Sequence, residues 1–139
     1  MRVFVASDHA GKKIKDHVCF FLKKSNKSFE DLSPVNNFDD DYPDFAKKVA
    51  KSVIERKGKG VLVCGTGIGM SIAANKFKGI RAALCSSPKE AELSRMHNNA
   101  NVLVLSGSLS KVVASKIISK FLSTRFGGGR HTRRIKKIE

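Results

Sequence analysis

Short apolar runs alternate along the chain with longer amphipathic segments. The runs have the length of β-strands, whereas apolar residues between them recur at helical spacing, as Ile14, Val18 and Leu22 do. The expected strands lie at residues 2–6, 27–32, 60–64, 80–84 and 101–105. The expected helices include the segment around Ile14 to Leu22, residues 43–56, a stretch from the glycine loop to about 77, residues 88–96 and residues 109–122.

Each expected strand is followed by a helix after a short connection. This alternation predicts a parallel sheet, because parallel strands need crossover connections that cover both faces of the sheet. We therefore expect a three-layer, Rossmann-like α/β fold with a five-stranded parallel sheet and right-handed crossovers. The length of 139 residues suits one domain. Residues 127–139 open with three glycines and continue as a basic tail that is able to pack away from its own domain.

Polar and glycine residues gather where the expected strands end. Ligands of open parallel sheets bind beyond the carboxyl ends of the strands. Residues 7–11 and 64–69 follow the first and third strands, and residues 97–99 come just before the fifth. We expect these three segments to converge on one edge of the sheet and to form the active site there.

The loop Cys64-Gly-Thr-Gly-Ile-Gly69 is the strongest local signal. Alternating glycines let successive backbone N–H groups point one way and bind an anion at the start of a helix. The loop does not match a dinucleotide fingerprint, because Met70 stands where that pattern needs glycine, and it lacks the Gly-Lys-Ser ending of a P-loop. The alternative is a tight turn whose glycines serve packing alone.

Cys64 is the candidate reactive group among three cysteines that form no C-x-x-C pair. A thiol at a strand end, facing the positive end of a helix, is favoured as a thiolate. Plain core filling is the alternative for a cysteine in an apolar run. We prefer core filling for Cys19 and Cys85, which lack the glycine loop.

The remaining titratable groups have simpler alternatives. Asp8 and His9 are either site residues or a helix cap with a surface histidine, and His97 is either a site residue or a histidine favoured by a helix dipole. Asp39-Asp40-Asp41 lacks the alternation of a calcium loop and is interpreted as a solvated turn. No histidine or carboxylate pair has metal-ligand spacing.

A net charge of +15 is the most unusual bulk property. Only five of the 27 basic residues lie in the tail, which favours a solvated basic surface over a nucleic-acid-binding module. A nucleic-acid-binding module is also expected to carry stacking aromatic residues, and the chain has no tryptophan and one tyrosine. No signal-like segment and no apolar stretch of roughly 20 residues occurs. We expect a cytoplasmic protein.

Several longer motifs resemble one known family. The chain is similar to the type B ribose-5-phosphate isomerases, which include the galactose-6-phosphate isomerase subunits. The motifs are Ser7-Asp-His-Ala-Gly11, Asp41-Tyr-Pro-Asp44, Cys64-Gly-Thr-Gly-Ile-Gly69, Ser71-Ile-Ala-Ala-Asn-Lys76, Ser94-Arg-Met-His-Asn98 and Gly128-Gly-Arg-His131 with Arg134.

This resemblance implies a reaction and a set of roles. The reaction is the interconversion of ribose 5-phosphate and ribulose 5-phosphate in the non-oxidative pentose phosphate pathway, without metal or cofactor. The resemblance makes Cys64 the base that moves a proton between C2 and C1, His97 the acid that opens the furanose ring, and Thr66 a further catalytic residue. The residues implied to bind substrate are Asp8, His9, Gly65, Gly67, Ile68, Gly69 and Asn98 for the sugar, with Arg130 and Arg134 for the phosphate. The implied assembly is a homodimer, or a tetramer of two dimers, with sites shared between subunits and the tail at an interface.

The chain departs from the family at one point. The family commonly has an arginine shortly after the fifth strand, where this chain reads Leu105-Ser-Gly-Ser-Leu-Ser110. Ser106, Ser108 or Lys111 are the residues available to replace it in part. The departure leaves open a six-carbon substrate, such as allose or galactose 6-phosphate.

Overall fold

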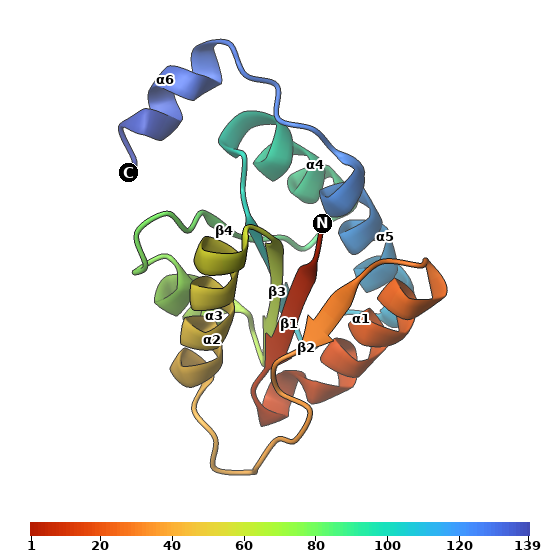
Figure 1. Ribbon diagram of the computed structural model, residues 1–139. Helices are drawn as coiled ribbons and strands as arrows, with labels where there is room; N and C mark the ends of the chain where they lie inside the picture. The colour runs from red at the N-terminus through yellow and green to blue at the C-terminus, as the bar shows by residue number, and fades with distance from the viewer.

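The computed structural model describes residues 1–139 and contains one five-stranded sheet between two helical layers (Figure 1). All neighbouring strands are parallel, in the order β2-β1-β3-β5-β4. The strands are β1 Val3–Ser7, β2 Phe29–Asp31, β3 Lys59–Cys64, β4 Ala82–Leu84 and β5 Val102–Ser106. The predicted fold class is confirmed.

Five α-helices connect or follow the strands. They are α1 Lys12–Lys24, α2 Tyr42–Arg56, α3 Ile68–Ala74, α4 Pro88–Asn98 and α5 Lys111–Ser123, with a 3-10 turn η1 at His9–Gly11 and a tail helix α6 at Arg130–Lys136. The sequence pattern did not predict α6, and it extended α3 to about residue 77. Helix α3 ends earlier because the side chain of Asn75 forms hydrogen bonds with the backbone N–H and the backbone carbonyl of Ala82. These two bonds fix the chain where β4 begins. None of the helices is both long and apolar enough to cross a membrane.

Both faces of the sheet are buried, which explains why the strands are continuously apolar rather than alternating. Successive strand residues point to opposite helical layers. One layer consists of α1, α4 and α5 and packs on Val5, Val63 and Leu105, whereas α2 and α3 pack on Phe4, Leu62 and Val104. Cys64 belongs to the side covered by α2 and α3.

Gly11 sets how closely the start of α1 approaches β3. A Cβ atom at position 11 would lie 2.6 Å from the carbonyl oxygen of Val63. Because a backbone atom cannot move aside without shifting the sheet, we expect Gly11→Ala to lower the free energy of unfolding by about 2 kcal/mol. Urea unfolding at one fixed protein concentration measures this change.

Gly65→Ala is the matched control for this substitution. A Cβ atom at position 65 would lie 3.6 Å from the Cβ of Ala10, an ordinary contact. Its stability is expected to change by less than about 1 kcal/mol. Equal losses in the two variants would show that the close approach of Gly11 to Val63 has no special cost.

Candidate active site

Cys64 ends β3 at the carboxyl edge of the sheet, as predicted. Its side chain is buried, and its Sγ accepts a hydrogen bond of 3.1 Å from the backbone N–H of Gly67. Gly67 has a φ of 80°, a left-handed conformation that turns this N–H back toward the sulfur. The glycine loop therefore supplies a hydrogen-bond donor to the thiol, as a thiolate sulfur requires.

The other two cysteines behave as core residues. Cys85 is buried and Cys19 is partly buried against the same hydrophobic cluster. Burial raises the pKa of each thiol to about 11, so both stay protonated near neutral pH. This environment agrees with the core-filling interpretation of Cys19 and Cys85.

Packing accounts for two of the three loop glycines. A Cβ atom at Gly67 would lie 2.5 Å from Cδ1 of Leu84, and one at Gly69 would lie 2.6 Å from Cζ of Tyr42. Gly65 differs, because its backbone φ is not in the left-handed region and its surroundings have room for a methyl group. Packing alone therefore does not explain glycine at position 65, which favours close approach of a ligand there. Thr66 lies beside it, exposed, with Oγ1 accepting the N–H of Ile68 at 3.2 Å.

The loop after β5 supports Cys64 from the other side. The N–H of Gly107 donates to the carbonyl of Cys64 at 2.8 Å, and the hydroxyl of Ser106 donates to the carbonyl of Gly65 at 2.9 Å. The Ser108 hydroxyl lies 2.8 Å from that of Ser106. Of the serines that the sequence offers in place of the expected arginine, Ser106 holds the glycine loop directly and Ser108 contacts it only through Ser106.

Asp8 and His9 lie at the carboxyl end of the neighbouring strand β1. Asp8 is buried and caps the turn η1, since its Oδ1 accepts the N–H of Gly11 at 3.0 Å. The capping interpretation is therefore correct for this oxygen, and Oδ2 takes no hydrogen bond within the chain. The His9 side chain is 40% exposed, and its Nδ1 lies 2.7 Å from Oδ1 of Asp40.

The prediction of a solvated turn at residues 39–41 is wrong for Asp40. Its side chain is only 11% exposed and accepts hydrogen bonds from His9 and from Asn36. Burial opposes its ionisation, but these donated hydrogen bonds outweigh burial and hold the pKa of Asp40 below its ordinary value. Asp40 and Asn36 carry no sequence signal for this contact, because neither sits at a strand end or in a recognisable motif.

His97 and Asn98 do not join this edge within one chain, so the predicted convergence of three segments is wrong. They end α4, which begins after β4 and runs back across the sheet to reach the start of β5. At this edge the backbone carbonyl of Asn98 accepts a hydrogen bond from Nε of Arg81, the residue that precedes β4. Residues before a strand and residues after a strand lie at opposite edges, separated by roughly 17 Å for a strand of five residues.

The tail joins His97 at that amino edge. The ring of His131 on α6 stacks on that of His97, with centroids 4.5 Å apart and planes 17° apart. Upstream, the N–H of Gly127 donates to the carbonyl of Met96 at 2.9 Å. The α6 helix lies at the end of the molecule where β1 starts (Figure 1). Because Arg130 and Arg134 flank His131 on α6, the sequence-predicted phosphate ligands lie on the same short helix as the ring that stacks on His97.

The chain therefore carries two clusters at opposite edges of one sheet. We call them the carboxyl-edge cluster, which comprises Asp8, His9 and residues 64–69, and the amino-edge cluster, which comprises His97, Asn98, Arg130 and Arg134. Neither gathers three histidine, cysteine or acidic side chains in an arrangement suited to a metal ion.

The fold and the carboxyl-edge cluster define an open α/β protein with a thiol at the edge of the sheet where ligands of such folds bind. A family model described as Ribose/Galactose Isomerase matches residues 3–138. The chain is 39% identical to ribose-5-phosphate isomerase B of Escherichia coli, over 99% of this chain and 93% of the relative. It therefore belongs to the ribose/galactose isomerase family, which favours an enzyme over a nucleic-acid-binding module.

Solved structures agree with this assignment. A ribose 5-phosphate isomerase from Thermotoga maritima is 49% identical and superposes with a TM-score of 0.96, covering 99% of this chain and 96% of that one. Ribose-5-phosphate isomerase B from Mycoplasma genitalium, solved with bound ribulose 5-phosphate, is 46% identical with a TM-score of 0.93, covering 99% and 93%.

Proposed function

We propose that this chain interconverts ribose 5-phosphate and ribulose 5-phosphate through an enediolate. The observation that carries the proposal is the Cys64 thiol, held at a strand end with its Sγ against the N–H of Gly67. The relatives of the chain support the substrate, since they are named as ribose-5-phosphate isomerases and one was solved with ribulose 5-phosphate.

In this reaction Cys64 accepts the proton from C2 of the open-chain aldose and returns it to C1. Negative charge develops on the substrate oxygens as the proton leaves. Within the loop from Gly65 to Gly69, the N–H of Gly67 donates to Cys64 Sγ and that of Ile68 donates to Thr66 Oγ1. The other backbone N–H groups of the loop are suited to stabilise the developing charge, because a fixed loop needs little reorganisation. Thr66 is an exposed residue of this loop, and we assign it a further catalytic role there.

The other predicted residues bind the substrate or prepare it. His97 donates the proton that opens the furanose ring, and Asp8, His9 and Asn98 hold the sugar hydroxyls. Arg130 and Arg134 bind the phosphate, because guanidinium groups pair with phosphate oxygens in a forked geometry. Ile68 forms the end of the glycine loop, where its N–H donates to Thr66 Oγ1, and its contact with the substrate stays a prediction.

The separation of the two clusters supports a homodimer. A five-carbon sugar phosphate is shorter than the roughly 17 Å that separates the two edges of the sheet, so one chain cannot place His97 and Cys64 on the same substrate. A twofold axis would bring the amino-edge cluster of one chain to the carboxyl-edge cluster of its partner, and would do so twice.

The surface beside the glycine loop is suited to such contact. Ile68 and Ile72 lie one turn apart on α3 and are 55% and 59% exposed, and Leu84 of the edge strand β4 is 39% exposed. Large apolar side chains grouped in this way are typical of an interface. Pairing of two dimers into a tetramer stays a prediction, as does the cytoplasmic location.

An assay with ribose 5-phosphate, with and without a chelator, tests this function. We expect turnover to ribulose 5-phosphate at the same rate under both conditions, because proton transfer by Cys64 needs no Lewis acid. Loss of activity in chelator, restored by a divalent ion, would contradict the metal-free mechanism.

The same assay with allose and galactose 6-phosphates tests substrate size. We expect kcat/KM to be highest for the five-carbon substrate. A higher value for a six-carbon substrate would favour the alternative that the absent arginine leaves open.

A further inference from the structure

The ring of His9 is held by a carboxylate from a segment 31 residues away. Oδ1 of Asp40 lies 2.7 Å from the ring nitrogen Nδ1 of His9 and accepts the backbone N–H of the same residue at 2.9 Å. We propose that Asp40 is a positioning residue for the isomerisation, which fixes the His9 ring so that Nε2 is the atom presented to the sugar. This inference rests on the proposed sugar-binding role of His9.

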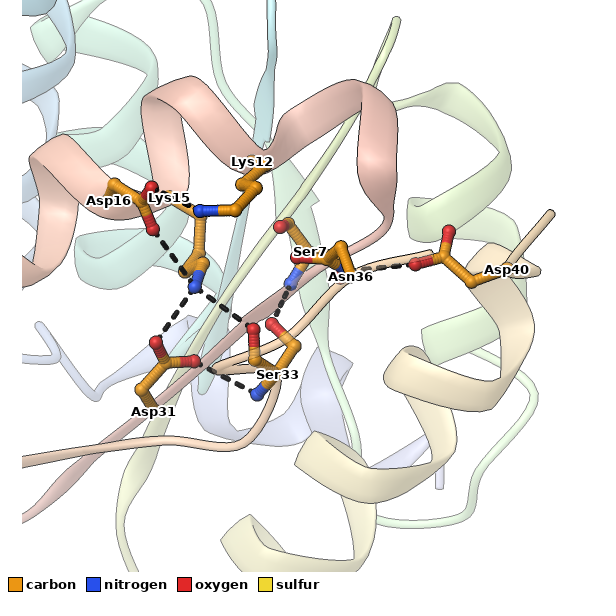
Figure 2. A network of polar contacts seen from close by, with 8 residues as sticks. All are labelled: Ser7, Lys12, Lys15, Asp16, Asp31, Ser33, Asn36 and Asp40. Carbon is orange, nitrogen blue, oxygen red and sulfur yellow. Dashed lines mark hydrogen bonds and ion pairs between the residues drawn. The ribbon is translucent and has the colours of Figure 1, made fainter. Parts of the chain in front are cut away.

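Asp40 is itself held in one position. Its second oxygen, Oδ2, accepts Nδ2 of Asn36 at 2.9 Å and the N–H of Asn37 at 3.2 Å. Asn36 also donates to the carbonyl of Ser7 at 2.8 Å, which ties the segment to the end of β1 (Figure 2). Both carboxylate oxygens are thus occupied from two sides, so the orientation of the acceptor is set before any substrate binds.

The chain segment that leads from β2 to Asp40 begins next to the buried ammonium group of Lys15. Lys15 of α1 is 1% exposed, and its ammonium group donates to Oδ2 of Asp31 at 2.8 Å and to the carbonyl of Ser33 at 3.0 Å. Ser33 in turn accepts the N–H of Ser7 on its hydroxyl at 2.9 Å. Figure 2 shows these contacts converging on Lys15 and Ser33. Because a buried ammonium group left unpaired is costly, this anchor strongly favours one path for the chain that leads to Asp40.

The contact decides which ring nitrogen carries the proton in neutral His9. A carboxylate accepts hydrogen bonds only, so Nδ1 carries hydrogen and Nε2 has the free lone pair. The hydrogen bond that the His9 ring donates to Asp40 also raises the pKa of His9. Desolvation opposes this rise, and the charges of Asp40, Asp8 and Asp39 add smaller contributions that raise the pKa further. The imidazolium form, in which Nε2 becomes a donor, therefore persists to higher pH than in an ordinary histidine.

Asp40→Asn tests the proposal, with Asp39→Asn as the matched control. An asparagine at position 40 offers one acceptor oxygen where four donors now converge, so the His9 contact is weakened. Asp39 lies exposed in the same turn, and its substitution changes the net charge equally without touching the ring. NMR titration of the His9 ring is expected to give a lower pKa in Asp40→Asn and a nearly unchanged one in Asp39→Asn.

Steady-state kinetics with ribose 5-phosphate give the second readout. We expect kcat/KM to fall about tenfold in Asp40→Asn, mainly through a higher KM, because His9 holds the sugar in the ground state as well as in the transition state. Asp39→Asn is expected to stay within about twofold of the wild type. Circular dichroism and thermal melts establish that the variants are folded.

A double-mutant cycle with His9→Asn shows whether Asp40 acts through His9. If it does, Asp40→Asn causes no further loss in the His9→Asn background. An equal loss in both backgrounds, or an unchanged His9 pKa in Asp40→Asn, would overturn the proposal. Wild-type kcat/KM in His9→Asn would remove the assigned role of His9 and the proposal with it. The isomerase function is judged separately, by the activity of the wild-type chain.

Discussion

Cys64→Ala is expected to lower kcat for ribose 5-phosphate isomerisation by about a hundred- to ten-thousand-fold, the usual range for a positioned acid–base group. The physical reason is that no other group at the carboxyl edge of β3 takes over the proton on C2. The Sγ contact with Gly67 is a single hydrogen bond, and the side chain that is lost is small. The variant should therefore stay folded, which a thermal melt checks.

Cys19→Ala is the control for this loss, because it removes a thiol that burial keeps protonated. It is expected to retain most of the wild-type kcat. A Cys64→Ala variant with near-normal turnover would refute the assignment of the base, whatever the behaviour of Cys19.

Mixing two impaired variants, Cys64→Ala and His97→Asn, is expected to restore activity. Cys64→Ala damages the carboxyl-edge cluster and His97→Asn the amino-edge cluster, which lie at opposite edges of the same sheet. In a heterodimer of the two, one site receives the intact Cys64 of one chain and the intact His97 of the other. Random assembly makes about half the dimers mixed, each with one intact site of two, so about a quarter of the wild-type activity should return.

The measurement is the initial rate from ribose 5-phosphate after the two variants are co-expressed or exchanged at equal amounts. This direction is chosen because ring opening by His97 matters more for the cyclic aldose than for ribulose 5-phosphate. As a control, Cys64→Ala mixed with the double variant Cys64→Ala/His97→Asn leaves no intact site and should stay inactive. A rate equal to the mean of the two separate variants would mean that His97 serves its own chain or has another role.

The order of apolar runs and amphipathic segments along the chain was enough to predict a five-stranded parallel sheet. Apolar runs such as 60–64 lack a polar face because helices cover both faces of the sheet. Each run is followed by a helix, and this alternation is typical of parallel strand pairing. The position of Cys64 at a strand end, before three alternating glycines, likewise followed from local sequence. The resemblance to a family then supplied residue roles that no spacing contains.

Only the tertiary structure decided that the predicted site residues fall into two clusters at opposite edges of the sheet. His97 precedes β5 and Cys64 ends β3, and because these strands are parallel the two residues lie at opposite edges of the sheet and do not meet within one chain. The contact of Asp40 with His9 was equally hidden, because it depends on the path of a loop anchored on Lys15 rather than on any periodicity. The sequence by itself determined the five strands, the five helices that follow them and the place of the thiol, apart from the end of α3 and the tail helix α6, since these depend on neighbours along the chain. Which polar groups face one another was decided only by packing between segments far apart in that chain.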